Sequence, residues 1–375
     1  MINRIRKKFK LESNNIKVRF LRKFYLNKIK SFDRVVLFLV PNDDQINGGV
    51  LSITSIHKEF TAQKKLHNCE VLTCTNFYNS EEYFLKFSKF KNKMMVFDIN
   101  SILKKLKTTT FLQLHIPELY LESFIHSYQN NWTSADQLIF QNIKSLQINI
   151  LNQNDLLMPN QLIIQKYKDV FNCEITITVA HKRYANIDKK NQYNVPLHYL
   201  SAWINPVPYD FKLYDNKKNI IVFSPDELSR LNIEYHLSKT DLITRFKENL
   251  PNFEIVVVKN MTYENYKKLV ANCKFMITFG EGLDGYLVET ILSGGISFAI
   301  YNAVFFTEGY EQLPTIYKTV DDLFNNIEKD IRFYDNKIEF DTYNNKMKEV
   351  CEIEYSYEKY QKRVLNFLNK NYDFK

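Results

Sequence analysis

Residues 274–301, KFMITFGEGLDGYLVETILSGGISFAIY, contain one complete strand-loop-helix-strand pattern. The apolar run 275–279 leads into a glycine-containing loop, which is typical of a buried parallel strand that enters a tight turn. Asp284 is suited to cap a helix after the loop, and a Gly-Gly pair ends that helix before the next apolar run, 296–301. The pattern predicts half of a doubly wound, nucleotide-binding α/β fold.

Two glutamates stand at the loop end of this pattern. Glu281 lies in the predicted loop and Glu289 lies two turns further on, with seven residues between them. In a doubly wound sheet the ligand binds at the carboxyl ends of the strands, where a helix N-terminus offers backbone N–H groups to phosphate. Carboxylates accept pairs of hydrogen bonds, which suits the vicinal hydroxyls of a ribose or another sugar. We therefore expect the two glutamates to bind different parts of one extended ligand.

The stretch 280–295, GEGLDGYLVETILSGG, resembles the EGFGL-x3-EAMACG-x-PVV signature of the family-4 retaining glycosyltransferases. These enzymes have the GT-B fold, in which two Rossmann-like domains face a central cleft. The resemblance implies that Glu281 contacts the donor hexose in a catalytic role and that Glu289 binds the ribose of the nucleotide. The resemblance also implies that three further residues of this stretch bind the donor, namely Gly282, Leu283 and Asp284.

The length and composition of the chain suit two soluble domains. Its 375 residues are 45% hydrophobic and 25% charged, which is enough to bury two cores. A proline-containing stretch without a clear period, 194–218, separates two series of alternating strand and helix patterns and indicates a linker. We expect an N-terminal Rossmann-like acceptor domain at 32–205 and a donor domain at 206–350. In GT-B proteins a terminal helix crosses back onto the first domain, and residues 351–375 are the candidate for it.

The first domain contains two further candidate features. Its first apolar run, RVVLFLVP at 34–41, predicts a buried strand, and Gly48 and Gly49 precede the following helix, where backbone lets a phosphate or sugar approach closely. This pair resembles the glycine-rich loop after the first strand in the same family. His115 leaves a later strand, and its position is similar to that of a histidine which the family uses near the donor, so we count it as a catalytic candidate. A strand-end histidine bonded only to backbone is the alternative.

The chain departs from the family at the cations that hold the donor diphosphate. The family has Gly-Arg after the first strand of the second domain and a lysine several residues later, whereas residues 223–239 are FSPDELSRLNIEYHLSK. Arg230 and Lys259 are the candidate donor-binding substitutes, together with Lys239. Each of them is also compatible with a solvated surface base.

The positive charge of the chain belongs to its N-terminus. Residues 1–31 contain 11 Lys and Arg and one acid, which leaves 40 basic and 41 acidic residues in the remainder. The apolar residues that recur there at spacings of three and four are Ile2, Ile5, Phe9, Ile16, Phe20 and Phe24. They predict one or two basic amphipathic helices that bind an anionic membrane surface, although packing of this stripe on the first domain is the alternative. Because the rest of the chain is nearly neutral, we do not expect a nucleic-acid partner.

Other sequence signals concern metals and location. The five cysteines are scattered and suggest neither disulfides nor a zinc site. Asp43 and Asp44 are interpreted as a cap, and GT-B enzymes generally need no bound metal, so we expect no metal and no cofactor besides the donor. With neither a membrane-spanning run nor a signal peptide, the expected location is cytoplasmic, at the inner face of the cell membrane.

The resemblance implies a metal-independent glycosyltransferase that moves a hexose or deoxyhexose from a UDP- or dTDP-sugar to a glycan or lipid-linked acceptor, with retention. Bacterial polysaccharide or O-antigen assembly is the expected setting. Since the diphosphate clamp is not recognisable, a nucleotide-sugar epimerase and a catalytically silent scaffold that binds glycan or partner proteins are alternatives. The sugar, the linkage and the oligomeric state have no signature in the sequence.

Overall fold

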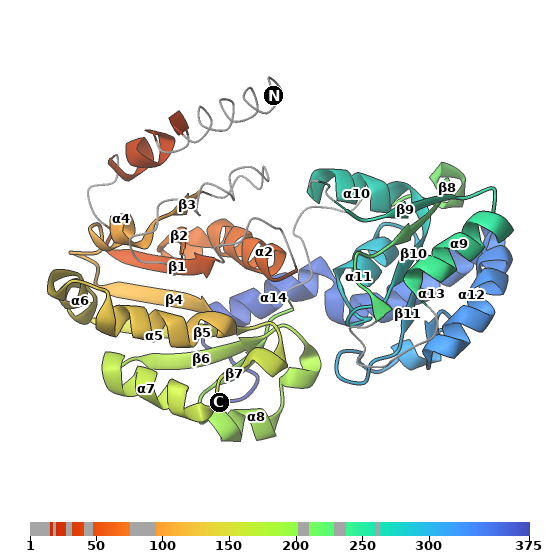
Figure 1. The fold of residues 1–375 in the computed structure, drawn as a ribbon. Coiled ribbons are helices and arrows are strands. Elements are labelled where there is room, and N and C mark those ends of the chain that lie inside the picture. Colours follow the sequence, from red (N-terminus) through yellow and green to blue (C-terminus); the bar gives the residue numbers. More distant parts are fainter. Residues whose placement is uncertain are drawn as a thin grey trace. The chain divides into compact units, whose positions relative to one another are not determined.

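Two parallel β-sheets, one in each of two units, organise the chain (Figure 1). The computed structural model describes residues 16–17, 20–27, 32–40, 48–75, 95–201, 210–228, 238–259, 261 and 263–375. The N-terminal unit comprises residues 1–202 and 361–375, and the C-terminal unit comprises residues 203–360. The first boundary therefore lies three residues before the expected one at 205, and the return to the first unit begins at 361 rather than at 351.

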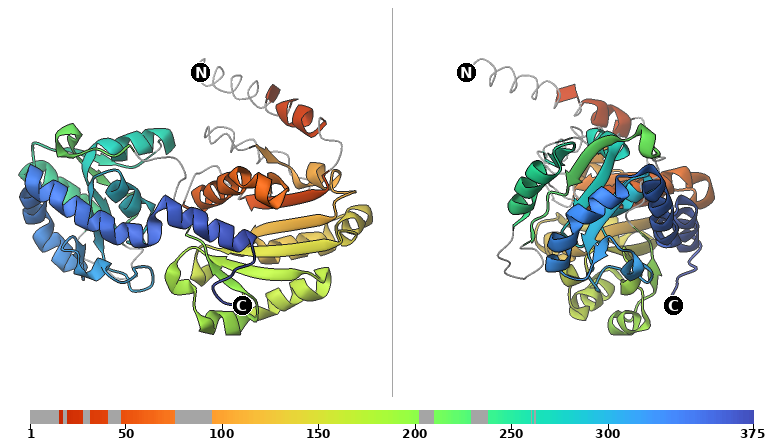
Figure 2. Two further views of the ribbon diagram at one scale, coloured as in Figure 1. Left: turned by 180° about the vertical axis from the view of Figure 1, so that it is seen from behind. Right: turned by 90° about the vertical axis from the view of Figure 1, so that its right-hand side faces the viewer.

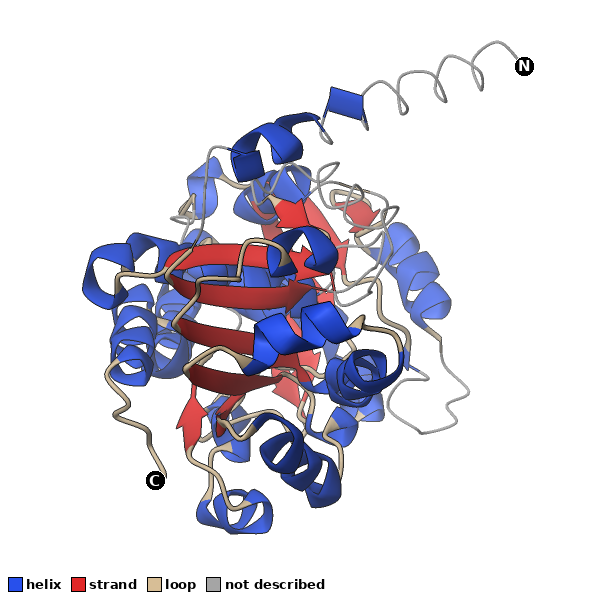
Figure 3. Ribbon diagram, turned by 90° about the vertical axis from the view of Figure 1, so that its left-hand side faces the viewer, coloured by secondary structure: helices blue, strands red, loops and turns tan. Residues whose placement is uncertain are grey.

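The N-terminal unit contains a seven-stranded parallel sheet with helices on both faces (Figure 3). In the order β3-β2-β1-β4-β5-β6-β7, its strands are β1 (Arg34–Val40), β2 (Glu70–Thr75), β3 (Val96–Phe97), β4 (Phe111–Pro117), β5 (Ser145–Asn152), β6 (Glu174–Val179) and β7 (Leu197–Tyr199). Its helices are α2 (Gly48–Ala62), α3 (Lys64–His67), α4 (Ile99–Leu103), α5 (Leu121–Asn130), α6 (Ser134–Gln141), α7 (Gln161–Phe171), α8 (Ile187–Tyr193) and the end of α14 (Tyr357–Leu368). Because both faces are covered, the central strands are buried along almost their whole length.

The end of the chain, from Gln361 onward, belongs to this first sheet. Phe374 and Leu197 exchange both backbone hydrogen bonds, at 2.8 and 3.0 Å, and so add an antiparallel bridge beside β7. Phe367 packs its ring against Phe60 of α2 at a centroid distance of 6.1 Å. The last residues are thus part of the hydrophobic core of the N-terminal unit.

The C-terminal unit contains a five-stranded parallel sheet. In the order β12-β11-β10-β8-β9, its strands are β8 (Lys218–Phe223), β9 (Glu254–Val257), β10 (Cys273–Thr278), β11 (Ile296–Ile300) and β12 (Ile316–Tyr317). Its helices are α9 (Lys239–Asn249), α10 (Tyr263–Asn272), α11 (Gly285–Leu292), α12 (Val320–Tyr334) and α13 (Lys337–Tyr355), and α13 packs against α11 and α12 (Figure 2). The stretch that predicted half of a doubly wound fold is β10-α11-β11, so that prediction is confirmed.

Each sheet has one point where the strand order changes direction. In the N-terminal unit the chain starts at β1, builds outward to β3 and then continues from β4 on the other side of β1. In the C-terminal unit the corresponding pair is β8 and β10. Loops diverge at the carboxyl ends of such a strand pair, which makes these two places the expected ligand sites of the two units.

The opposite, amino-terminal edge of the C-terminal sheet is held by polar contacts to the ends of helices. The ammonium group of Lys217 donates to the carbonyl oxygens of Ala271 at 3.2 Å and Ser293 at 3.1 Å, and so binds the last turns of α10 and α11. Burial lowers the pKa of Lys217 to about 8. Next to it Gly294 has φ +87°, and a Cβ atom there would overlap the carbonyl group of Lys212. Glycine is therefore required at this position.

No helix among the described residues combines the length and the apolar character needed to cross a bilayer.

The substitution Gly294→Ala tests this close approach. We expect it to lower the free energy of unfolding by about 3 kcal/mol or more, because the new methyl group meets backbone and the residue keeps a left-handed conformation. Gly309→Ala is the matched control, since Gly309 also has a positive φ of +96° but its Cβ would meet only Val350 side-chain atoms, at 3.5 Å. The control should cost about 1–2 kcal/mol. Equal losses for both variants in urea unfolding would contradict the proposed steric role of Lys212.

Candidate functional site

Two loops meet at the carboxyl ends of β8 and β10. Residues 224–227 follow β8 and residues 279–284 follow β10. A Cβ atom on Gly280 would lie 3.1 Å from Cγ and Oδ2 of Asp226, so the second loop passes directly under the side chain of the first. This contact defines the candidate site as the place where the strand order of the C-terminal sheet changes direction.

Gly282 fixes the course of the second loop. Its φ is +78°, and a Cβ atom would overlap the ring of Phe306 and lie 2.7 Å from the carbonyl oxygen of Ile300. Only glycine fits both the backbone conformation and the space. The neighbouring Glu281 is half-buried and lies between this turn and Gly280. The turn therefore determines where the Glu281 carboxylate stands.

Asp284 joins the end of β10 to the start of α11. Its Oδ1 accepts a hydrogen bond from the backbone N–H of Leu287 at 2.9 Å, and its Oδ2 accepts one from the hydroxyl of Thr278 at 2.6 Å. Burial raises the pKa of this carboxyl group to about 7. The expected cap is present, but the carboxylate is already bonded within the protein, and the Leu283 side chain is fully buried. The side chains of these two predicted donor-site residues are therefore not available to bind a ligand directly.

Glu289 is a buried acid on α11. Its side chain is 4% exposed, and its Oε1 accepts a hydrogen bond of 2.6 Å from the hydroxyl of Tyr263, the first residue of α10. Its Oε2 is also buried but has no hydrogen-bond partner within the described part of the chain. Burial raises the pKa of Glu289, and the charge of Lys267 and the hydroxyls of Tyr263 and Tyr266 oppose that rise. An unsatisfied buried acceptor is costly, and a ligand hydroxyl would satisfy it.

The candidate cations differ in their availability. Lys239 begins α9 and donates to three carbonyl oxygens of the loop after β8, those of Ser224, Pro225 and Asp226, at 3.0–3.2 Å. It therefore stabilises this loop. Lys259 follows β9 and is exposed. Arg230 lies outside the described residues.

The two candidate glycines of the N-terminal unit lie at the start of α2. Gly48 and Gly49 form the first turn of α2, at the carboxyl end of the sheet. The Gln153 amide donates to the Gly49 carbonyl oxygen at 3.2 Å and to the Ser52 hydroxyl at 2.9 Å, which ties α2 to the loop after β5. Asp43 and Asp44 lie outside the described residues.

The expected position of His115 at the end of its strand is wrong. β4 continues to Pro117, and the imidazole is completely buried, with its ring stacked on Phe38 at 4.2 Å. One ring nitrogen bonds to the side chain of Gln113 at 3.2 Å and the other to that of Asn149 at 3.1 Å. Burial lowers the pKa of His115 to about 3, so the ring is neutral at pH 7. These contacts make His115 a core residue and argue against a catalytic role.

The ionisable group at the carboxyl end of β4 is Glu118 instead. Its Oε1 accepts backbone hydrogen bonds from Gln153 at 3.2 Å and Asn154 at 2.9 Å, and burial raises its pKa to about 7. Glu118 was not among the candidates from the sequence, although its place directly after a predicted strand and a proline was a usable signal. Nearby, Lys189 forms an ion pair with Asp155, and burial lowers the pKa of this lysine to about 8.

Comparison with known proteins gives a fold but no sequence relative. No protein-family model and no curated protein match the chain. Solved structures do match. An alpha-glucosyltransferase in complex with UDP has a TM-score of 0.55 and 10% identity, over 90% of this chain and 100% of the other. TarM has a TM-score of 0.51 and 10% identity, and a sucrose-phosphate synthase from Thermosynechococcus elongatus has 0.51 and 8%; each match covers 90% of this chain and 99% of the other.

The chain has the GT-B fold. These similar structures are GT-B glycosyltransferases, as the Glu-x7-Glu stretch led us to expect, but they do not distinguish the family-4 type. At 8–10% identity they establish architecture alone. The assignment of residues to a reaction therefore depends on the geometry described above.

The raised pKa of Asp284 predicts a specific pH dependence. The group titrates near 7 in the folded protein and near its ordinary value of 3.8 when unfolded, so its neutral form is favoured on folding. Its contribution to stability is complete below about pH 4 and is lost as the pH rises to about 7. Asp284→Asn keeps a cap without a charge, and its stability should rise relative to the unsubstituted protein by about 1–4 kcal/mol between pH 4 and 8.

Urea unfolding of both proteins at several pH values measures this difference. Asp284→Ala is the control, because it removes the charge and the cap together and should be less stable than Asp284→Asn at every pH. A difference between the unsubstituted protein and Asp284→Asn that does not change with pH would show that the carboxyl group is ionised normally.

Proposed function

We propose that this protein is a glycosyltransferase whose C-terminal unit binds a nucleotide diphosphate sugar where β8 and β10 diverge. The observation that carries the proposal is the Oε2 atom of Glu289, a buried acceptor without a hydrogen-bond partner among the described residues. Glu289 also accepts a hydrogen bond from the hydroxyl of Tyr263. It lies in the C-terminal unit, which is the unit that is expected to bind the nucleotide in the GT-B fold. The vicinal hydroxyls of a ribose have the donor that this atom requires.

The donor would extend from Glu289 toward Glu281. With the ribose on Glu289, the diphosphate meets the backbone of residues 280–283 in front of α11, and the hexose meets Glu281. Asp284 already accepts from the first turn of α11, but its pKa near 7 leaves its negative charge partly neutralised, which lowers repulsion with the diphosphate. Exposed Lys259 is the candidate cation for the departing diphosphate. We propose that Glu281 orients the sugar and stabilises positive charge at its anomeric carbon.

The details of the proposed reaction are inferred from the resemblance of the Glu-x7-Glu stretch to the family-4 glycosyltransferase signature. They are transfer of a hexose or deoxyhexose, UDP or dTDP as the nucleotide, retention of configuration, and a glycan or lipid-linked acceptor in polysaccharide or O-antigen assembly. One similar structure was solved with UDP, and another alpha-glucosyltransferase structure was solved with UDP-glucose and DNA. The acceptor would bind the N-terminal unit, where Gly49 and Glu118 lie at the carboxyl end of the sheet.

Attachment to the inner face of an anionic membrane is supported by the N-terminal helix. Residues 20–27 are helical, and the members of the apolar stripe that the structure describes are exposed: Ile16 by 68%, Phe20 by 70% and Phe24 by 51%. The opposite side of this helix holds it to the N-terminal unit, because Leu26 is buried and Tyr25 stacks on Phe97 at 5.8 Å. The described part of the stripe is thus exposed, Ile2, Ile5 and Phe9 lie outside the described residues, and the sequence of residues 1–31 has a net charge of +10.

Two substitutions separate nucleotide binding from turnover. Glu289→Ala should weaken UDP binding about tenfold or more in calorimetry, since it removes the acceptor for the ribose. Glu281→Ala should lower kcat more than it lowers nucleotide affinity, because it acts on the sugar. Glu248→Ala, an exposed glutamate on α9, is the matched control and should change neither quantity. An unchanged UDP affinity for Glu289→Ala would remove its ribose role.

The transfer assay distinguishes the alternatives. The protein is incubated with radiolabelled UDP- and dTDP-sugars and a panel of acceptors: a bacterial lipid extract, soluble glycans and duplex DNA. We expect label in the lipid or glycan fraction. Interconversion of the free nucleotide sugar would indicate an epimerase, nucleotide binding without turnover would indicate a silent scaffold, and label in DNA would contradict the proposed acceptor class.

Liposome flotation tests the membrane attachment. The double variant Phe20→Ser, Phe24→Ser should lose most of its binding to anionic vesicles, because both exposed rings are removed from the apolar face while every charge is retained. Phe333→Ser is the control, since this exposed phenylalanine lies on α12 and far from the basic segment in the sequence. Equal flotation of the double variant and the unsubstituted protein would overturn the attachment.

A further inference from the structure

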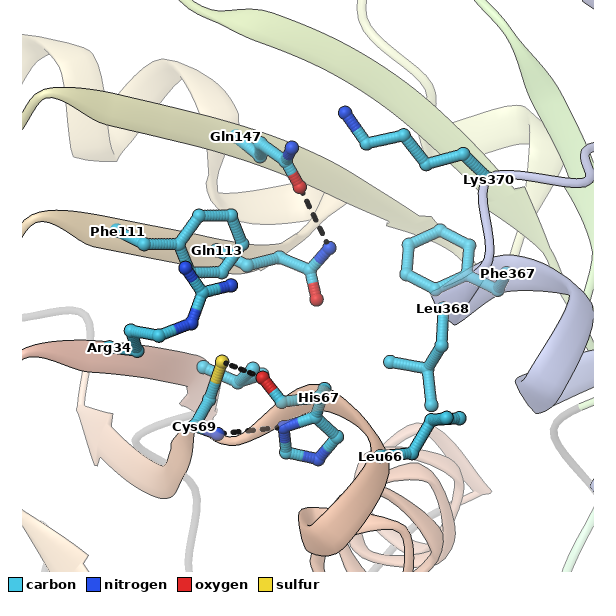
Figure 4. A pocket seen from close by; sticks show the side chains of 11 residues that line it. Arg34, Leu66, His67, Cys69, Phe111, Gln113, Gln147, Phe367, Leu368 and Lys370 are labelled. Carbon is cyan, nitrogen blue, oxygen red and sulfur yellow. Dashed lines mark hydrogen bonds between the residues drawn. The ribbon is translucent and has the colours of Figure 1, made fainter.

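A separate cavity of about 270 Å³ lies at the amino-terminal edge of the N-terminal sheet (Figure 4). Arg34, the first residue of β1, Gln113 of β4 and Gln147 of β5 form one side of it, and Phe367 and Leu368 at the end of α14 form the other. Parallel strands place all their amino ends at one edge. The cavity is therefore at the opposite edge from α2 and Glu118, and the proposed transfer reaction does not use it.

Arg34 is the main cation of the cavity, and its side chain also contacts the thiol of Cys69. The guanidinium group of Arg34 lies over the ring of Phe111, 4.2 Å from its centroid, and within the described residues no acidic side chain forms an ion pair with it. Lys370 is a second cation at the cavity, although Glu174 pairs with it at 2.6 Å. Guanidinium presents a planar set of donors that matches a carboxylate, so the cavity is electrostatically suited to an anion.

The two amides beside Arg34 are held in fixed orientations. The Gln113 amide nitrogen donates to the Gln147 oxygen at 3.2 Å, and the Gln147 nitrogen donates to Glu174 at 3.1 Å. The Gln113 oxygen in turn accepts from the ring of His115 at 3.2 Å. Each amide oxygen thus accepts one hydrogen bond, and the Gln113 nitrogen retains a second N–H group. The Arg34 guanidinium and the Gln113 amide therefore supply hydrogen-bond donors to the polar side of the cavity.

The opposite side of the cavity is apolar. Phe367 and Leu368 face Arg34 across it, with Leu66 of α3 below them (Figure 4). The volume of the cavity corresponds to about nine water molecules. It can hold a small aromatic carboxylate but is too small for a nucleotide sugar. A ligand that fits both sides has one anionic end and a compact apolar body.

We propose that this cavity is a binding site for a small organic carboxylate, with the carboxylate on Arg34 and the apolar body against Phe367 and Leu368. One wall comes from the start of the sheet and the other from the end of the chain, so the ligand connects the two. Binding therefore stabilises the docking of the chain end on the sheet, and the stability of the protein rises with ligand concentration.

Calorimetric titration of the full chain with benzoate tests the site. Benzamide, which has the same shape and no charge, is the first control, and inorganic phosphate, an anion without an apolar body, is the second. We expect benzoate to bind at least about tenfold more tightly than either control, because hydrogen bonds to charged groups and the apolar contact both contribute. Equal affinity for benzoate and benzamide, tighter binding of phosphate, or no binding of benzoate at millimolar concentration would overturn the proposal.

Two variants locate the site. Arg34→Gln should weaken benzoate binding about tenfold or more. Leu66→Trp fills the cavity from a position where the side chain is half exposed, so it should abolish binding without loss of the fold as judged by circular dichroism. Lys166→Gln, which removes one positive charge from the exposed face of α7, is the matched control and should bind as the unsubstituted protein does. Unchanged benzoate affinity in Leu66→Trp would place the bound carboxylate elsewhere and overturn the proposal.

Discussion

The carboxylate of Asp284 joins the strand and the helix on which the candidate donor site depends. One oxygen accepts from Thr278 at the end of β10 and the other from Leu287 in the first turn of α11, while Gly282 turns the chain between them. With both ends of the loop held in this way, Glu281 and Glu289 have fixed positions relative to the sheet. The arrangement costs stability at neutral pH, because the buried carboxyl group resists ionisation. A loop held in this way would meet the proposed donor without rearranging.

Local patterns were sufficient to predict β10, α11 and β11. Each is an apolar run bounded by glycines or by a cap, and such boundaries act within a few residues. The predicted position of His115 was wrong because the local sequence does not show that β4 continues to Pro117. It also does not show that Phe38 and Asn149 enclose the ring. A strand that ends two residues later presents a different side chain at its carboxyl end, and here that side chain is Glu118.

The remaining features that the sequence did not predict depend on contacts between residues that are distant in the sequence. The hydroxyl that binds Glu289 comes from Tyr263 on another helix, and Lys239 bonds to carbonyl groups that a sequence pattern does not reveal. The cavity around Arg34 is formed by strands of the N-terminal sheet and by residues near the C-terminus, which meet only after folding. Because all strands of the N-terminal sheet run in the same direction, the sheet has two chemically different edges. Its carboxyl edge has Glu118 and the start of α2, and its amino edge has the cavity that we propose binds a carboxylate.

The central claim is that the Glu289 Oε2 atom receives a ribose hydroxyl. A crystal structure of the protein with UDP measures this directly. We expect a ribose oxygen about 2.5–3.0 Å from that atom, the range of hydrogen bonds between hydroxyl groups and oxygen, and the diphosphate in front of residues 280–283. UDP bound at another edge of the sheet, or bound here with Glu289 Oε2 still lacking a hydrogen bond, would contradict it.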